Sequence, residues 1–314
     1  MISTASLTVL FATRNGESVL PRTLEAYCRV DAPTRPWKMV IVDNGSQDST
    51  QAILASFRKR LPLETLQEPT AGKNRALNRG LTACEGRLVI ITDDDAMPDP
   101  SFLTAWEKYL DQNSNYEIFG GSIGLHFEVP PPSWMLTSVA QLDVMLDVMF
   151  SVRDLPEGPI TADAIFGPNM AVRSSVFENG FRFNENIGPN GSDPDYPMGS
   201  ETEFCCRVAQ SGVKAWFAKE PRVQHIVRSN QLTSSYWAKR AYRHGRGVAR
   251  RMWESGQAAP GALRPVIIDR LYALRHRVQM FAPFPRQRFN SVWAYHWRRG
   301  FRDEQAKRQF MILS

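Results

Sequence analysis

The chain has 314 residues, of which 43% are hydrophobic and 22% charged, values typical of a soluble globular protein with one large domain or two small ones. No apolar run is long enough to span a bilayer and the N-terminus lacks the pattern of a secretory signal, so we expect a cytoplasmic protein. The net charge of +6 favours an anionic partner, and the four cysteines lack the spacing of a zinc site.

The first part of the chain alternates strand-like and helix-like segments. Short apolar, β-branched runs predict strands, and the segments between them repeat apolar residues at helical spacing. The predicted strands are Leu7–Ala12, Trp37–Val42 and Leu63–Leu66, and the predicted helices are Ser18–Cys28, a helix that begins at Ser46 or Asp48, and Gly72–Cys84. This alternation indicates an open α/β sheet with parallel strands, in which ligands bind at the carboxyl ends of the strands.

Three carboxylates, Asp93, Asp94 and Asp95, follow the next predicted strand, Leu88–Thr92. Because side chains alternate along an extended chain, Asp93 and Asp95 point to one side and Asp94 to the other. The three charges repel one another unless a cation lies among them, and a divalent ion shared with substrate phosphates fits hard oxygen ligands. The alternative is a solvated acidic loop.

Polar residues also follow the first two strands. Arg14 and Asp43 should therefore face the same crevice as Asp93. For Asp43, the alternative is a role as turn-former or helix cap within Asp-Asn-Gly-Ser.

Beyond Asp95 the sequence predicts a helix at Ser101–Leu110, a strand at Gly120–Leu125 and a helix at Glu201–Ser211. The last part of the chain is rich in arginine and aromatic residues, at Leu232–Glu254 and Arg264–Phe310. Basic helices with aromatic faces are typical of membrane-surface elements. Packing of these helices against the main domain, or binding of nucleic acid, are the alternatives.

Several motifs together resemble glycosyltransferase family 2, in the same order along roughly residues 5 to 245. They are Val9–Asn15, Val40–Thr50, Gly72–Leu81, the Asp-X-Asp-like Thr92–Asp95, Gly167–Arg173, Gly199–Arg207 and Pro221–His225. The resemblance implies an α/β GT-A fold, Rossmann-like, with a mixed, mostly parallel sheet flanked by helices. Residues 1–230 would form the catalytic domain, with a nucleotide-binding half (1–96) and an acceptor half (97–230), and residues 231–314 would form a basic, amphipathic helical extension.

The resemblance also implies an activity and roles for individual residues. The chain would be an inverting hexosyltransferase that takes a sugar from a nucleoside diphosphate, with UDP favoured, and uses Mn²⁺ or Mg²⁺. Asp95 and His225 would bind the metal, although a lone histidine is more often structural. The residues assigned to the nucleotide sugar are Ala12, Arg14, Asp43, Lys73, Asp93, Asp94 and Asn169.

Glu201 is the candidate base that deprotonates the acceptor hydroxyl. The family usually has Gly-Glu-Asp-X-Glu or -Asp here, whereas this chain has Gly199-Ser200-Glu201-Thr202-Glu203, with Glu at the position of the usual Asp. As the first turn of a helix favours a negative charge, Glu201 should stay ionised. Glu203 is the second candidate, and its alternative role is a surface or arginine-paired acid.

The acceptor would be a saccharide or a lipid-linked molecule in polysaccharide or glycolipid synthesis, and the protein would be cytoplasmic or peripheral on the inner face of the plasma membrane. A nucleotidyltransferase is a competing interpretation, but Ala12–Gly16 is not a phosphate-binding glycine loop. A nucleic-acid-binding protein is another, and the acidic strand end argues against it because it repels phosphate unless a cation intervenes.

Overall fold

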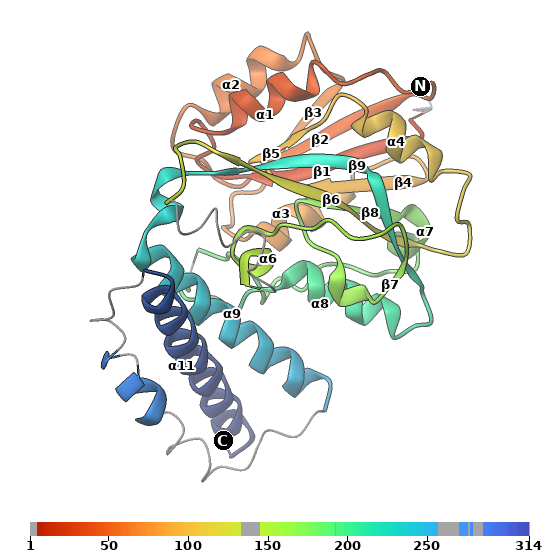
Figure 1. Cartoon of the computed structure of the whole chain (residues 1–314). Helices are drawn as coiled ribbons and strands as arrows, with labels where there is room; N and C mark the ends of the chain where they lie inside the picture. Colours follow the sequence, from red (N-terminus) through yellow and green to blue (C-terminus); the bar gives the residue numbers. More distant parts are fainter. Residues whose placement is uncertain are drawn as a thin grey trace.

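The computed structural model describes residues 5–132, 145–191, 193–256, 270–275, 277–278 and 285–313. Within these residues a single sheet has the strand order β3-β2-β1-β4-β8-β6-β9-β5, and β7 pairs with β9 (Figure 1). The strands are β1 (Leu7–Thr13), β2 (Trp37–Asp43), β3 (Leu63–Gln67), β4 (Leu88–Thr92), β5 (Ala96–Pro98), β6 (Ile118–Phe127), β7 (Gly158–Ile160), β8 (Asn169–Arg173) and β9 (Ala215–Val227). The helices are α1 (Leu20–Tyr27), α2 (Thr50–Phe57), α3 (Lys73–Leu81), α4 (Phe102–Lys108), α6 (Met145–Phe150), α7 (Ser174–Glu178), α8 (Ser200–Ala209), α9 (Ser234–Glu254) and α11 (Pro285–Leu313).

The predicted α/β fold is confirmed. The first four strands pair in parallel, and the predicted helices between them are present as α1, α2 and α3. β6 and β9 also pair in parallel, while β4–β8, β8–β6, β9–β5 and β7–β9 are antiparallel, so the sheet is mixed.

Both faces of the central strands are covered, which explains their nearly uninterrupted apolar sequence. In β1, Val9 and Phe11 pack into one core cluster, together with Trp106 of α4. Leu10 points to the opposite face, into a cluster that contains Phe204 of α8. In the register of β1 and β2, Thr13 pairs with Asp43, so their polar ends lie at the same edge of the sheet.

The acceptor half contains strands that the sequence does not predict. β9 is the longest strand described, yet Pro221 interrupts its apolar pattern, and the pairing of β6 with β9 shifts register between Gly121 and Ser122. β5 has only three residues, but it pairs Ala96 with His225 and so brings the acidic strand end next to that histidine.

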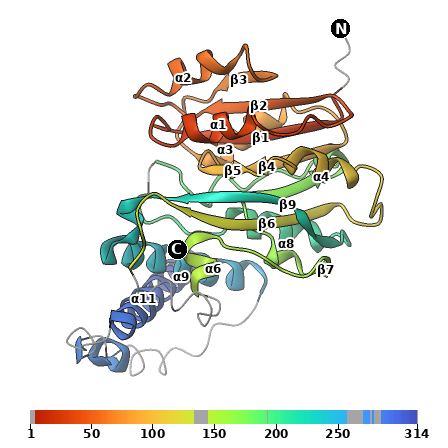
Figure 2. The same cartoon turned by 45° about the horizontal axis from the view of Figure 1, so that its top comes forward.

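The two long C-terminal helices pack against each other at the end of the molecule that also holds α6 and α8, away from α1 and α2 (Figures 1 and 2). Trp237 and Trp293 are both 7% exposed and lie in a core cluster that α9 and α11 share. A Cβ built at Gly245 would lie 2.0 Å from the Trp297 carbonyl oxygen, so glycine is required at this helix crossing. The aromatic faces of α9 and α11 therefore pack inside the protein, against each other and against β9 and α6. A role of these helices at a membrane surface stays a prediction. None of the helices in the described part of the chain is both long and apolar enough to cross a bilayer.

A buried ion pair also joins these helices. Two guanidinium nitrogens of Arg246, Nε and Nη2, donate to Glu304 at 2.9 and 2.8 Å, and Glu304 is 1% exposed. Arg246 also pairs with Asp193, at 2.8 Å, and so ties the helices to the loop before α8.

We predict that Glu304→Ala lowers the free energy of unfolding by about 3 kcal/mol, because it leaves a buried guanidinium without this partner. Glu220→Ala is the matched control, since Glu220 pairs with Lys108 on the surface and its loss should cost under about 1 kcal/mol. Urea denaturation followed by circular dichroism measures both changes. Equal losses for the two variants would contradict the role of the buried pair.

Candidate active site

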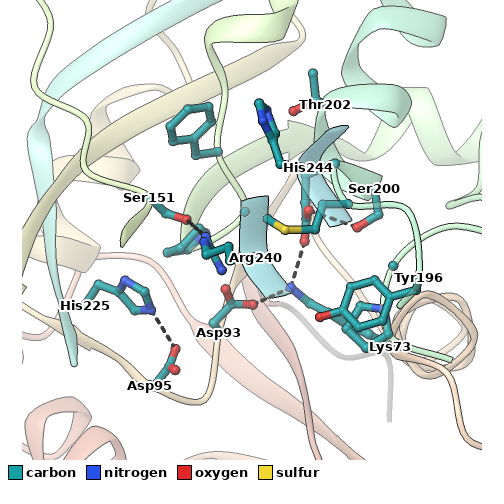
Figure 3. A pocket seen from close by; sticks show the side chains of 18 of the residues that line it. Lys73, Asp93, Asp95, Ser151, Tyr196, Ser200, Thr202, His225, Arg240 and His244 are labelled. Carbon is teal, nitrogen blue, oxygen red and sulfur yellow. Dashed lines mark hydrogen bonds and ion pairs between the residues drawn. The ribbon is translucent and has the colours of Figure 1, made fainter. Parts of the chain in front are cut away.

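A cavity of about 570 Å³ lies at the carboxyl ends of β1 and β4, between the N-terminal ends of α3 and α8 and one face of α9 (Figure 3). Most of the residues that the sequence assigns to the site line it. They are Ala12, Arg14, Lys73, Asp93, Asp94, Asp95, Glu201 and His225. The sheet therefore brings together side chains that are more than 200 positions apart in the sequence.

Lys73 joins two of the predicted acids. Its Nζ donates to Asp93 Oδ1 at 2.6 Å and to Glu201 Oε1 at 2.7 Å, from the first turn of α3 (Figure 3). Burial alone would raise the pKa of Glu201, but the ammonium group of Lys73, with smaller effects from a backbone amide and from Ser200, outweighs burial and holds that pKa below the ordinary value. The opposite holds for Asp93, where burial dominates and raises the pKa. Glu201 is thus kept as a carboxylate, able to accept a proton.

Glu201 lies in the first turn of α8, and its surroundings hold its side chain in place. Ser200 Oγ donates to Glu201 Oε2 at 2.9 Å. A Cβ at Gly167 would lie 2.6 Å from Glu201 Oε1, so the carboxylate occupies space that only glycine leaves open. Glu203, the second candidate, instead accepts from Arg207 at 2.7 Å and does not line the cavity, as the arginine-paired alternative predicts.

Asp95 and His225 face each other at the other side of the cavity. His225 Nε2 lies 3.4 Å from Asp95 Oδ1, and both residues are 8% exposed. His225 Nδ1 lies 2.6 Å from the carbonyl oxygen of Phe150, and a carbonyl can only accept, so Nδ1 carries a hydrogen. Burial lowers the pKa of His225, but Asp95 outweighs burial and raises it, so a proton can sit between the two groups.

A divalent cation fits the same position. A histidine that donates one ring nitrogen to a carbonyl presents the other to a metal, and a carboxylate beside it supplies an oxygen ligand. The described residues contain no group of three or more His, Cys, Asp or Glu side chains that could hold a metal. Substrate oxygens or water would have to complete the coordination. Arg228 Nη2 lies 3.5 Å from Asp95 Oδ2, so this guanidinium would have to move away from that oxygen for a metal to bind it.

Asp94 has a different partner from Asp93 and Asp95, because, among the described residues, a hydroxyl and not a cation contacts its carboxyl group. Its Oδ2 accepts from Thr13 Oγ1 at 2.6 Å, at the end of β1 and close to the start of α1. Burial, with a smaller effect from Asp95, raises the pKa of Asp94 to about 7. Asp94 is therefore a hydrogen-bonded acid inside the cavity and not a solvated one.

Two assigned residues lie behind the cavity wall. Asp43 is fully buried, and its Oδ1 accepts from the Ser46 amide at 2.9 Å, which is the turn-forming alternative. We expected Asn169 to flank the sugar, but it is fully buried and its Nδ2 donates to the carbonyl oxygens of Ser122 and Pro221, at 2.9 and 3.0 Å. The carboxamide thus connects β8 to β6 and β9, because a buried amide needs partners that the irregular strand pairing leaves open.

Sequence reasoning missed the wall that α9 contributes. Tyr236, Arg240, His244 and Arg251 all line the cavity. The spacing of the first three, at i, i+4 and i+8, places them on one helical face and was the available signal. The sequence interpretation treated these basic residues as a surface face, and the predicted domain boundary at 230 separates them from the site they help to form.

The model of the family described as "Glycosyl transferase family 2" matches residues 8–181. Among curated proteins, the beta-monoglucosyldiacylglycerol synthase of Trichormus variabilis is 30% identical over 94 residues, which are 29% of this chain and 20% of that protein. The glycosyltransferase AglE of Haloferax volcanii is 22% identical over 225 residues, which are 67% of this chain and 74% of that protein. This chain therefore matches only about a fifth of the synthase's length.

Solved structures share the fold at low identity. The mannosyltransferase PcManGT from Pyrobaculum calidifontis, in complex with GDP-Man and Mn²⁺, has a TM-score of 0.63 and 15% identity, with 97% of this chain and 88% of that chain covered. Staphylococcus aureus TarS 1-349, in complex with UDP-GlcNAc, has a TM-score of 0.53 and 15% identity, with coverage of 97% and 92%. Both are likenesses of fold.

We predict that Lys73→Gln destabilises the protein, and increasingly so as the pH rises. In the native chain the lowered pKa of Glu201 adds stability above its unfolded value of about 4.5, which is lost as the pH falls through the folded pKa. Without Lys73, burial raises the pKa of Glu201, so stability instead falls as the pH rises above about 4.5. Urea unfolding between pH 4.5 and 8 should show a loss that grows to about 3 kcal/mol.

Lys38→Gln is the control for this prediction. Lys38 also bridges two carboxylates, Glu64 and Glu85, at 2.9 and 3.0 Å, but their side chains are 45% and 36% exposed. Its loss should be small and nearly independent of pH in this range. A flat pH profile for Lys73→Gln would contradict the electrostatic role of Lys73.

Proposed function

Since this chain belongs to glycosyl transferase family 2, we propose that it is an inverting hexosyltransferase that moves a sugar from a nucleoside diphosphate donor to an acceptor hydroxyl. One observation carries this proposal: Asp95 and Glu201 line one cavity, with Lys73 between Glu201 and the acidic strand end. The reaction needs a cationic site for the departing diphosphate and a separate base for the incoming hydroxyl. In this proposal Asp95 and His225 provide the first and Glu201 the second.

The donor binds along the ends of β1 and β4. Ala12, Arg14, Lys73, Asp93 and Asp94 line this part of the cavity and would contact the nucleotide and the sugar. Asp43 and Asn169 lie behind it and would position the turn after β2 and the strands β6 and β9. We favour UDP, which the resemblance implies; UDP-GlcNAc is the ligand of the TarS structure, although the mannosyltransferase structure holds GDP-Man.

Asp95 and His225 would hold Mn²⁺ or Mg²⁺. When bound, the ion supplies Lewis-acid stabilisation of the negative charge that develops on the leaving diphosphate. Arg228, which reaches Asp95, and Arg240, which lines the same cavity, add positive charge from the protein itself. Arg240 donates to the Val148 carbonyl and to Ser151 Oγ, so it flanks Phe150, whose carbonyl orients His225.

Glu201 takes the proton of the acceptor hydroxyl as that oxygen attacks the anomeric carbon. Attack from the side opposite to the diphosphate inverts the configuration at this carbon. Lys73 keeps Glu201 ionised and fixes one carboxylate oxygen, while Ser200 donates to the other. The proton balance is simple, because the carboxylate gains the proton that the hydroxyl loses.

The acceptor is a saccharide or a lipid-linked molecule, in line with the names of the similar proteins, among them a beta-monoglucosyldiacylglycerol synthase and a poly(ribitol-phosphate) beta-N-acetylglucosaminyltransferase. In this proposal the protein works in polysaccharide or glycolipid synthesis. It would act in the cytoplasm or at the inner face of the plasma membrane, with the basic C-terminal helices toward anionic lipid.

We predict that Glu201→Gln keeps UDP affinity within about threefold but lowers the rate of transfer by about 10²–10⁴, the usual effect of losing a general base. Isothermal titration with UDP and a radiolabelled-sugar transfer assay measure the two quantities. Glu203→Gln is the matched control and should stay close to the native rate, because Glu203 pairs with Arg207 outside the cavity. A near-native rate for Glu201→Gln would mean that another group is the base.

We predict that Asp95→Asn abolishes the effect of Mn²⁺ on nucleotide-sugar binding. In the native protein, UDP-sugars with Mn²⁺ should raise the melting temperature more than either alone, since a ligand that binds only the folded state stabilises it. Asp99→Asn serves as the control, because Asp99 follows β5 and does not line the cavity. If Asp95→Asn retains the full Mn²⁺-dependent shift, the metal lies elsewhere.

A further inference from the structure

Arg251 of α9 lines the cavity, yet its guanidinium has no ion pair or hydrogen bond to any other residue in the described part of the chain. Three other cations of the cavity, Lys73, Arg153 and Arg228, each have a carboxylate within 4 Å. Arg251 is partly buried, and burial lowers its pKa more than Cys206, Asp163 and Glu254 raise it. A desolvated guanidinium without a partner is unfavourable, and an anion would relieve it.

The backbone at the start of α8 makes room for this guanidinium. Gly199 has a φ of +98°, and a Cβ built on it would lie 2.4 Å from Arg251 Nη1. The same Cβ would lie 3.9 Å from the Cβ of Thr202. Arg251 therefore lies against Gly199 at the start of α8, two residues before Glu201.

His244 adds a third group on the same wall. Its Nδ1 accepts from Trp297 Nε1 at 2.9 Å, so Nε2 carries the hydrogen when the ring is neutral. Burial, and then Arg251 and Arg240, lower the pKa of His244 to about 3, so the ring is neutral near pH 7. Figure 3 shows His244, Thr202 and Ser200 on the side of the cavity away from Asp95 and His225.

This position distinguishes Arg251 from the cations of the donor side. Lys73 spans from Asp93 to Glu201, whereas Arg251 lies at Gly199, at the start of the helix that carries Glu201. Arg228 and Arg240, in contrast, contact Asp95 and the segment around Phe150. A group bound at Arg251 would thus belong to the molecule that presents its hydroxyl to Glu201.

We propose that Arg251, with Thr202 and His244, forms an anion-binding subsite for the acceptor, which carries a carboxylate or a phosphate near its reacting hydroxyl. The guanidinium would pair with the anion through two hydrogen bonds, the hydroxyl of Thr202 would donate a third, and the first turn of α8 favours negative charge. The inference rests on the proposed function, because it takes Glu201 as the base that the acceptor approaches.

The test is isothermal titration of the full chain saturated with UDP and Mg²⁺. Three probes are compared: methyl phosphate, methyl β-glucuronide and, as the uncharged match of the latter, methyl β-glucoside. We expect at least one anion to bind saturably and the glucoside to bind more weakly than the glucuronide. Arg251→Gln should weaken binding of that anion by about tenfold, the effect of losing one charge-assisted pair.

Lys239→Gln is the matched control, because it removes the same charge from an exposed position of the same helix outside the cavity. It should change anion binding by less than about twofold, since exposed charges interact weakly. Thr202→Val gives a second variant if Arg251→Gln does not fold, with a smaller loss in the same direction.

The outcomes separate this inference from the proposed function. Absence of UDP binding would overturn the proposed function itself. If UDP binds but neither anion does, if the glucoside binds as tightly as the glucuronide, or if the two charge variants lose anion affinity equally, the subsite is refuted. A matching loss of UDP affinity in Arg251→Gln would also refute it, because the guanidinium would then serve the donor.

Discussion

The ammonium group of Lys73 lies between two buried carboxylates, 2.6 Å from Asp93 and 2.7 Å from Glu201, and the rest of the site depends on it. Without a cation there, burial would favour the neutral form of Glu201, which could then not serve as a base. With it, the pKa of Glu201 lies below its ordinary value, whereas burial still raises the pKa of Asp93. The same contact separates the cavity into a side with Asp95 and His225 and a side with Gly199 and Arg251.

The fold supplies this arrangement from distant parts of the chain. Parallel pairing brings the ends of β1 and β4 together, and the antiparallel pairing of β5 with β9 places His225 opposite Ala96, next to Asp95. α8 contributes Glu201 from its first turn, and α9 closes the cavity with Arg240, His244 and Arg251. α9 is therefore part of the cavity wall, and the buried Arg246–Glu304 pair joins it to α11.

The sequence predicts those elements whose apolar pattern is simple. The strands ending at Thr13, Asp43 and Thr92 are mostly buried apolar residues, and polar residues at the ends of the first and third line the cavity, whereas Asp43 lies behind its wall. β9 was not predictable, because Lys219, Glu220 and Pro221 interrupt its pattern. A strand with such an interruption forms only because β6 pairs with it across a register shift, which no local signal reveals.

Many of the residues that line the cavity lie in motifs that the sequence singles out, but their contacts with one another could not be predicted. Lys73 and Glu201 are 128 positions apart, so their ion pair follows from the fold alone. Asp43 and Asn169 carry polar side chains in the expected motifs, yet burial turns both toward backbone groups. Arg251 resembles the other arginines of α9 in sequence, and only the structure distinguishes its unpaired guanidinium from that of Arg250, which pairs with Glu254.

The central claim is that a divalent cation and the base lie on opposite sides of Lys73 in one cavity. Anomalous diffraction from crystals grown with UDP and Mn²⁺ tests it most directly, because the manganese signal locates the ion independently of the protein coordinates. The account predicts one manganese within bonding distance of Asp95 and of His225 Nε2, with Glu201 still paired to Lys73. Manganese bound to Glu201, or a site that excludes both Asp95 and His225, would contradict it.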